Sequence, residues 1–109
     1  MEKSSLTATA RQQLELANKA ASGRSSLTVY GGHEHVLRQT VIALAEGQQL
    51  DDHESPGEAT VHVLHGRVSL IAGDTSWEGS PGDLLVVPPD RHSLKALEAC
   101  VVLLTVAKR

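Results

Sequence analysis

The 109-residue chain has the length of one ordinary domain, and its 40% hydrophobic and 21% charged residues are typical of a folded globular protein rather than a disordered or membrane-spanning one. With a net charge of -3, no Phe, one Trp and one Tyr, it lacks the basic face and the aromatic platforms that nucleic-acid binding requires. We therefore expect no nucleic-acid and no membrane partner, and a core built from Val, Leu, Ile and Ala.

The amino-terminal segment predicts one amphipathic helix. Apolar residues recur there at helical spacing, at Leu6, Ala10, Leu14, Ala17 and Ala21. Ser4, Ser5 or Thr7 can cap its start, and Gly23 can end it in a left-handed conformation. The segment lacks the apolar stretch of a signal peptide, so the expected location is cytoplasmic. The apolar stripe could also pack across a partner subunit and serve assembly.

The rest of the chain consists of short runs of Val, Ile, Leu and Thr separated by glycine-containing turns, which predicts an all-β domain. We assign residues 1–24 to the helix and its linker and residues 25–109 to this domain. Strands so short and so evenly spaced are typical of a sandwich or barrel. The predicted strands are 26–31, 36–46, 48–53, 59–65, 67–72, 74–78, 83–87, 92–97 and 99–107.

Two stretches of this domain resemble the motifs of the cupin superfamily. The first motif of that family begins with a glycine, reaches a histidine after five further residues, and closes on a glycine; here Gly47, His53 and the Gly66 of "VHVLHG" match. The second motif is matched by "GDLLVVPPDRHS", which supplies Gly82, Asp83, Pro88 and His92. The resemblance covers about residues 36–107. It implies a double-stranded β-helix, or jelly-roll barrel, preceded here by the short α-helix and commonly assembled as a homodimer.

The metal ligands that the resemblance implies are incomplete in this chain. Metal-binding cupins use two histidines and a glutamate from the first motif and one histidine from the second. Aligned on the first motif, the second histidine position is Ser55 and the glutamate position is Ala59, so only His53 and His92 remain. The second motif is also one residue short, with Asp90 where the family usually has glycine. Tightly held Fe, Mn, Zn or Ni normally takes at least three protein ligands.

Three residues are candidates for a third metal ligand. Glu58 is one position out of register, which on a strand turns the side chain to the other face unless the adjacent Ser-Pro-Gly turn breaks the alternation. His33 and His35 in "GGHEHV" are two residues apart and would share a face of an extended segment. Their alternative role is as exposed loop histidines before a strand. His62 and His65 are expected on the outer surface or at a dimer interface.

Arg38 is the candidate for contact with an anionic ligand. Together with Thr40 it makes one face of its predicted strand polar at the start. If that face looks into the barrel, the guanidinium could pair with an anion; if it looks outward, the side chain is solvated. Cys100, the single cysteine, lies in an apolar run without a neighbouring cation and is expected to be a buried, unreactive thiol.

Two functions from different classes are consistent with these residues. In the first, the protein is a homodimeric, non-catalytic or ligand-binding cupin whose aliphatic pocket carries Arg38, His53 and His92 as polar groups. In the second, it is a metal-dependent enzyme of the dioxygenase or isomerase type that acts on a small polar metabolite. There, His53, His92 and an unorthodox third ligand would hold the ion. The residues do not name the ligand or substrate.

Overall fold

The computed structural model describes residues 2–54 and 57–108, so Ser55, the second histidine position of the first motif, lies outside the described residues. One helix precedes nine strands in this part of the chain. Each strand predicted from the sequence is present, with ends that differ by no more than two residues, which confirms the all-β class with a short amino-terminal helix. In chain order the elements are α1 (Leu6–Lys19), β1 (Arg24–Gly31), β2 (Leu37–Leu44), β3 (Gln49–His53), β4 (Gly57–His65), β5 (Val68–Ala72), β6 (Thr75–Gly79), β7 (Leu84–Val86), β8 (His92–Ala96) and β9 (Cys100–Lys108).

The helix begins where the sequence predicts and ends earlier. Ser5 is the cap, because its side-chain oxygen accepts a hydrogen bond from the backbone N–H of Ala8 at 3.2 Å. The helix ends at Lys19, since Ala20 has an extended backbone with φ -76° and ψ 140°. The prediction that Gly23 ends the helix is therefore wrong. Gly23 does adopt a left-handed φ of +69°, and it forms the turn that leads into β1.

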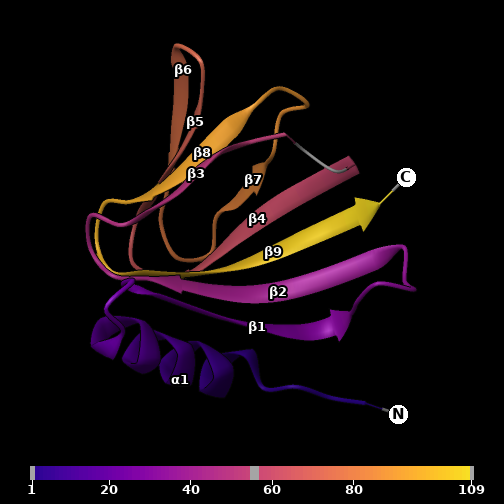
Figure 1. Ribbon diagram of the computed structural model, residues 1–109, viewed down its shortest axis with the longest axis vertical. Coiled ribbons are helices and arrows are strands. Elements are labelled where there is room, and N and C mark those ends of the chain that lie inside the picture. Colours follow the sequence, from indigo (N-terminus) through magenta and orange to yellow (C-terminus); the bar gives the residue numbers. More distant parts are fainter. Residues whose placement is uncertain (1, 55–56, 109) are drawn as a thin grey trace.

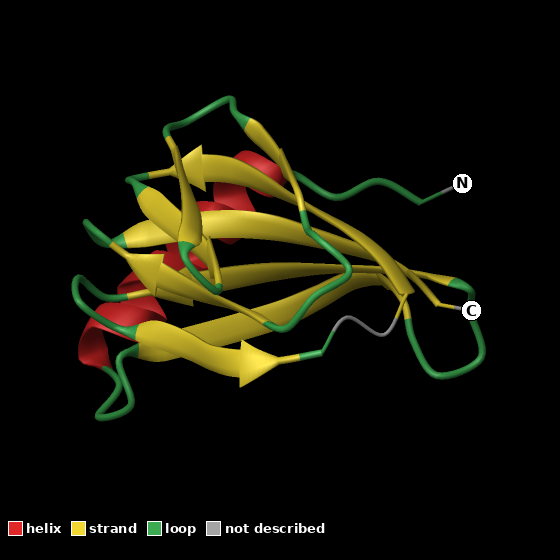
Figure 2. Ribbon diagram, turned by 90° about the horizontal axis from the view of Figure 1, so that it is seen from above, coloured by secondary structure: helices red, strands yellow, loops and turns green. Residues whose placement is uncertain are grey.

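Two antiparallel sheets form the jelly-roll barrel (Figure 1). The five-stranded sheet has the order β1-β2-β9-β4-β7, and the four-stranded sheet has the order β3-β8-β5-β6. The helix α1 lies against the outer face of the five-stranded sheet, so the layers are helix, sheet and sheet (Figure 2). No helix in the described residues is long and apolar enough to cross a membrane.

The register of β2 decides which side chains enter the barrel. Ile42 and Leu44 belong to the cluster between the sheets, whereas Val41 and Ala43 belong to the cluster under α1. Residues that pair directly in antiparallel strands share a face, so Val102, the partner of Ile42 on β9, also points inward. The buried side chains between the sheets are Leu44, Ala59, Val61, Val63, Val68, Leu70, Val87, Leu94, Ala96, Cys100, Val102 and Val106.

The helix is held over β1 and β2 by small apolar residues and one polar contact. Ala10 and Ala17 are buried against the sheet and let the helix approach it closely. Between them, Gln13 is only 5% exposed, and its side-chain oxygen accepts a hydrogen bond from the Ser25 hydroxyl of β1 at 2.5 Å. This contact fixes where along the sheet the helix sits, because a buried amide left without a partner would be costly.

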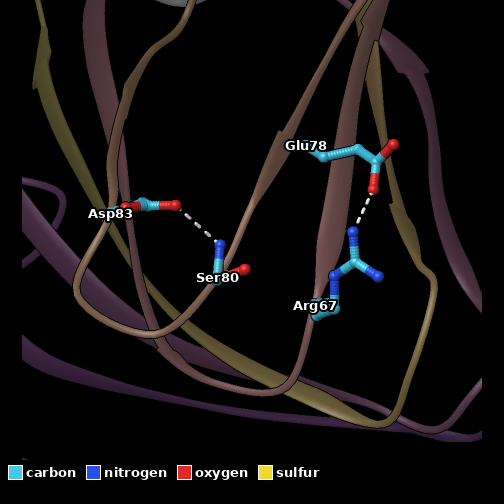
Figure 3. A network of polar contacts seen from close by, with 4 residues as sticks. All are labelled: Arg67, Glu78, Ser80 and Asp83. Carbon is cyan, nitrogen blue, oxygen red and sulfur yellow. Dashed lines mark hydrogen bonds and ion pairs between the residues drawn. The ribbon is translucent and has the colours of Figure 1, made fainter.

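The acid of the second motif closes the turn between β6 and β7. The carboxylate of Asp83 accepts a hydrogen bond from the backbone N–H of Ser80 at 2.8 Å (Figure 3). Beside this turn, the Arg67 guanidinium donates to the Glu78 carboxylate and ties the start of β5 to β6 on the surface. Asp83 therefore has a structural role, as is common for aspartate in tight turns.

Cys100 is fully buried, in agreement with the expectation of an unreactive thiol. Burial raises the pKa of the Cys100 thiol from 9.0 to about 11, although a hydrogen bond with the backbone of Leu44 lowers it in part. In the unfolded chain the thiol ionises near its ordinary pKa, so the native state holds the proton more tightly. The resulting stabilisation is complete below about pH 9 and is lost as the pH rises towards 11.

We therefore expect the free energy of unfolding to fall by about 2 to 3 kcal/mol between pH 9 and pH 11 through this thiol alone. The measurement is urea unfolding over that pH range for the natural protein and for Cys100→Ala, which removes the titrating group. The loss should be smaller in the variant by this amount. An identical pH dependence of the two proteins would contradict the assignment to Cys100.

Candidate functional site

His53 and His92 meet at one end of the barrel. They are a directly opposed pair on β3 and β8, and their ring centroids lie 4.4 Å apart with an interplanar angle of 62°. His92 is only 6% exposed, whereas His53 is exposed at the edge of the sheet. The structure thus brings together the two candidate ligands, His53 and His92, which belong to different motifs of the sequence.

A β-bulge makes this meeting possible. Leu50 faces the interior and pairs with Leu94, and His53 pairs with His92. From the first pair to the second, β3 advances by three residues while β8 advances by two. In a regular strand a residue three positions after Leu50 would point outward. The additional residue in the bulge, within Asp51 and Asp52, returns His53 to the interior face.

Both imidazoles are held in the same tautomer by the backbone. Nδ1 of His53 lies 2.9 Å from the carbonyl oxygen of Asp51, and Nδ1 of His92 lies 3.0 Å from the carbonyl oxygen of Asp90. Because a carbonyl only accepts, each Nδ1 must carry the proton and donate it. In the neutral ring Nε2 then has a free lone pair, which can accept a hydrogen bond or bind a metal ion.

The carbonyls of Asp51 and Asp90 are the functional groups that sequence reasoning missed. Both histidines stand at the end of an Asp-x-His sequence, in "DDH" and in "DRH", and each donates its Nδ1–H to the backbone carbonyl two residues upstream. That repeated spacing was the available signal. A backbone carbonyl leaves no other mark in a sequence, since its identity does not depend on the side chain.

The pair borders a cavity of about 30 Å³ inside the barrel. One buried water needs about 10–15 Å³ of such volume, and small-molecule sites usually have roughly 300–1,000 Å³. The cavity can therefore hold a water molecule, an ion or the polar end of a ligand, but not a whole metabolite. Apart from the two histidines its lining is aliphatic, formed by Ile42, Leu50, Val61, Leu70, Val87, Leu94, Val102 and Leu104.

The side chains beside the histidines do not complete a metal-binding set. Ala59, the glutamate position of the first motif, lies on β4 with its methyl group in the barrel core and is 8% exposed. Within the described residues, no group of three His, Cys, Asp or Glu side chains lies close enough to hold an ion. The two imidazoles supply two of the three protein ligands that a tightly held transition metal needs, so the donor set does not fit such an ion.

The candidate third ligands lie elsewhere. Glu58 is exposed and neighbours the inward-facing Ala59 on β4, so the strand alternation directs it away from the interior. His33 and His35 are exposed in the segment between β1 and β2, and the His35 ring packs edge-on against Tyr30 at 5.5 Å. The structure does not bring any of the three to the histidine pair.

Arg38 lies on the interior face of β2. It is four residues before Ile42 on a strand that pairs regularly with β9, and its direct partner there is the buried Val106. Val106 in turn pairs with Ala59 on β4, so all three belong to one row across the inner face of the five-stranded sheet. Arg38 is half-buried, and its guanidinium has no hydrogen bond or ion pair within the described residues.

The rim around His53 carries acidic side chains and one cation. Asp51, Asp52 and Glu54 are all exposed next to the bulge. The Arg91 guanidinium donates to the carbonyl oxygen of Asp52 at 3.3 Å and lies 4.0 Å from the Glu54 carboxylate. This cation offsets part of the negative charge and ties the strand β3 to the residue before His92.

Comparisons with protein-family models and with curated proteins gave no match. Among solved structures, a conserved protein of unknown function from Streptococcus pyogenes is 31% identical over 83% of this chain and 78% of its own, with a TM-score of 0.74. An RmlC-like cupin from Desulfovibrio desulfuricans is 25% identical over 77% of this chain and 81% of its own, with a TM-score of 0.67. Salicylate 1,2-dioxygenase from Pseudoaminobacter salicylatoxidans matches 93% of this chain and 33% of its own with a TM-score of 0.74, but at 19% identity it shows the fold alone.

Proposed function

Because the chain belongs to the cupin superfamily, we propose that it is a homodimeric, non-catalytic ligand-binding protein. The observation that carries this proposal is the pair of imidazoles with free Nε2 atoms at the end of an otherwise aliphatic cavity. Solved neighbours of this fold include both enzymes and proteins without an assigned activity, so the fold does not decide between the classes.

Two neighbouring acceptors, on rings whose centroids lie 4.4 Å apart, are suited to a ligand group that carries N–H or O–H donors. Each neutral imidazole offers one lone pair at Nε2, and the surrounding aliphatic side chains offer no competing partner. The cavity of about 30 Å³ admits only this polar end, so the remainder of the ligand lies outside, over the rim. Arg38, on the interior face of β2, is the group that would pair with an anionic portion of the ligand.

The homodimer is supported by exposed aliphatic side chains on one strand. Leu84 and Val86 of β7 are 61% and 73% exposed and point away from the barrel, since they pair with His62 and Thr60 on the outer face of β4. Adjacent exposed aliphatic residues of this size mark contact surfaces. Sedimentation equilibrium measures the mass in solution, and a monomer at micromolar concentration would contradict this part of the proposal.

The alternative is the metal-dependent enzyme, and one observation favours it. An Nδ1–H tied to a backbone carbonyl is the arrangement that usually orients a metal-binding histidine, and both imidazoles have it. The missing third ligand stands against it. The two functions therefore differ in a measurable quantity, the metal content of the protein and its dependence on the two histidines.

The decisive experiment combines metal analysis with a small probe. Protein made without a histidine tag is expected to hold clearly less than one transition-metal ion per chain, unchanged in His53→Ala and His92→Ala. Acetamide, whose amide has two N–H donors, should shift the Nε2 resonances of both histidines in a saturable way. These shifts should be lost in His92→Ala and kept in His62→Ala, which removes a histidine from the outer face. Stoichiometric metal that is lost in both barrel variants would instead establish the metal-dependent alternative.

A further inference from the structure

A groove of about 350 Å³ lies outside the barrel, between α1 and the outer face of the five-stranded sheet. Its volume is about twelve times that of the barrel cavity and falls within the usual range of small-molecule sites, roughly 300–1,000 Å³. Its apolar surface comes from three positions one turn apart on the helix and from two strands of the sheet. These side chains are Leu6, Ala10, Leu14, Leu64 and Val101.

The groove exists because of where the helix sits. The Gln13–Ser25 hydrogen bond holds α1 towards β1, at one edge of the five-stranded sheet. The sheet continues past the helix to β9 and β4, where Leu64 is left half-buried on the outer face. Leu6 and Leu14, on the side of the helix that faces this open part, are half-buried as well. The apolar walls thus stay partly accessible although the helix and the sheet are both well packed.

The groove is lined by a guanidinium and an imidazole, with no carboxylate among the described residues that line it. Arg11 from α1 and His65 from the end of β4 line it, and its other lining residues are apolar apart from Thr7. The Arg11 guanidinium has no ion pair or hydrogen bond within the described residues, and Glu15, one turn further along the helix, is paired with Lys19 at 3.1 Å. A guanidinium without a side-chain partner, in the same groove as an imidazole, favours an anionic ligand there.

We propose that this groove binds an anionic amphiphile, with a carboxylate beside Arg11 and His65 and a short aliphatic chain along Leu14, Leu64 and Val101. The site is separate from the barrel cavity and does not depend on the function proposed for it. The guanidinium selects the planar carboxylate by paired hydrogen bonds. The apolar side chains of the groove favour the aliphatic chain of the ligand, and each methylene that leaves water strengthens binding roughly three- to fourfold.

A second copy of the chain fits this groove less well than such a ligand. A two-fold contact centred on the groove would bring the same patch of both copies together. The Arg11 and His65 side chains of the two copies would then approach one another, and no carboxylate lines the groove to offset them. The exposed Leu84 and Val86 are on the same outer face of the sheet but lie on β7, one strand further from the helix than β4.

The test is a titration of the full-length, ¹⁵N-labelled protein with octanoate, followed by amide chemical shifts. We expect saturable shifts in the first half of α1, at the end of β4 and at the start of β9. Octan-1-ol, which has the same chain without the charge, should bind about tenfold more weakly, as expected for the loss of a charge-assisted hydrogen bond. Butyrate, which lacks four methylenes, should bind more weakly by a larger factor.

Matched variants distinguish octanoate binding in the groove from nonspecific binding elsewhere on the surface. Arg11→Gln keeps a good helix former and should weaken octanoate about tenfold. Arg24→Gln removes the same charge from β1 and should leave the affinity unchanged. Equal affinity for octanoate and octan-1-ol, no effect of Arg11→Gln, or shifts confined to the barrel histidines would each overturn the proposal. So would a dimer that Leu64→Asp dissociates, because a second copy would then cover the groove.

Discussion

Replacing Ala59 with glutamate is expected to turn the histidine pair into a transition-metal site. The methyl group of Ala59 already points into the barrel from β4, at the position where metal-binding cupins carry their glutamate. A carboxylate there would join His53 and His92 and give the three protein ligands that tight binding requires. After purification with zinc and dialysis, we expect about one ion per chain in Ala59→Glu and clearly less in the natural protein.

The stability of Ala59→Glu should then depend on the metal. Without an ion, a carboxylate in this aliphatic environment lowers the free energy of unfolding by at least about 2 kcal/mol, because it is buried without a partner. With free zinc at about one hundred times its Kd, the gain is about 2.7 kcal/mol, which corresponds to a rise in Tm of roughly 10–20 °C for a domain of this size. Differential scanning calorimetry with and without zinc measures the difference.

Ala59→Gln is the control for size, since it adds an uncharged side chain of the same shape. Its Tm should also fall, and zinc should restore little of it. If Ala59→Glu bound no more zinc than Ala59→Gln, position 59 would not point at the histidine pair, and the correspondence with the family's first motif would be wrong at this residue.

Gly66→Ala is expected to be among the most destabilising single substitutions in this chain. Gly66 has a left-handed φ of +76°, and a Cβ atom placed there would lie 2.1 Å from the carbonyl oxygen of Ala99 and 2.8 Å from Cα of Cys100. Both contacts are with backbone atoms, which cannot turn aside as a flexible side chain can. The hairpin between β4 and β5 would have to move away from the start of β9.

Gly73 provides the matched comparison. It also has a left-handed φ, +58°, but a Cβ atom there would meet nothing within 4 Å. Gly73→Ala should therefore lower the free energy of unfolding by about 1 to 2 kcal/mol, the conformational cost alone. Gly66→Ala should lower it by at least about 2 kcal/mol more, because of the steric clash. If urea unfolding showed the same loss of free energy for both variants, the close approach of Ala99 would not contribute to the effect of Gly66→Ala.

These two positions also show why the first motif predicted the fold better than the function. Only glycine fits at position 66 without strain, because the backbone at Ala99 and Cys100 passes against it, and this requirement of the barrel does not depend on what the protein does. Ala59, by contrast, packs in the core as an inward-facing residue, and its side chain carries no atom that could bind a metal. A chain can thus keep the spacing of a motif while its chemistry changes.

The strands were predictable because alternation and turn-forming glycines are local signals. The meeting of His53 and His92 was predictable only through the resemblance, since β3 and β8 are separated by four other strands in the sequence. The sequence did not decide whether Arg38 points into the barrel, because Gln39 interrupts the apolar face on the opposite side of its strand. Only the pairing of β2 with β9 shows that Arg38 is on the interior face. The groove beside α1 was not predictable, because it depends on where the helix settles across the sheet.

The bulge in β3 has a further consequence for the motion of the site. β3 is an edge strand that pairs only with β8 in the described part of the chain, and its ladder is interrupted between Leu50 and His53. Edge segments with few paired backbone groups open at a lower free energy than central strands. His92 lies on β8, which is paired on both sides, whereas His53 lies on an edge strand with an interrupted ladder. The two imidazoles can therefore separate and rejoin through local fraying of one strand while the rest of the barrel remains folded.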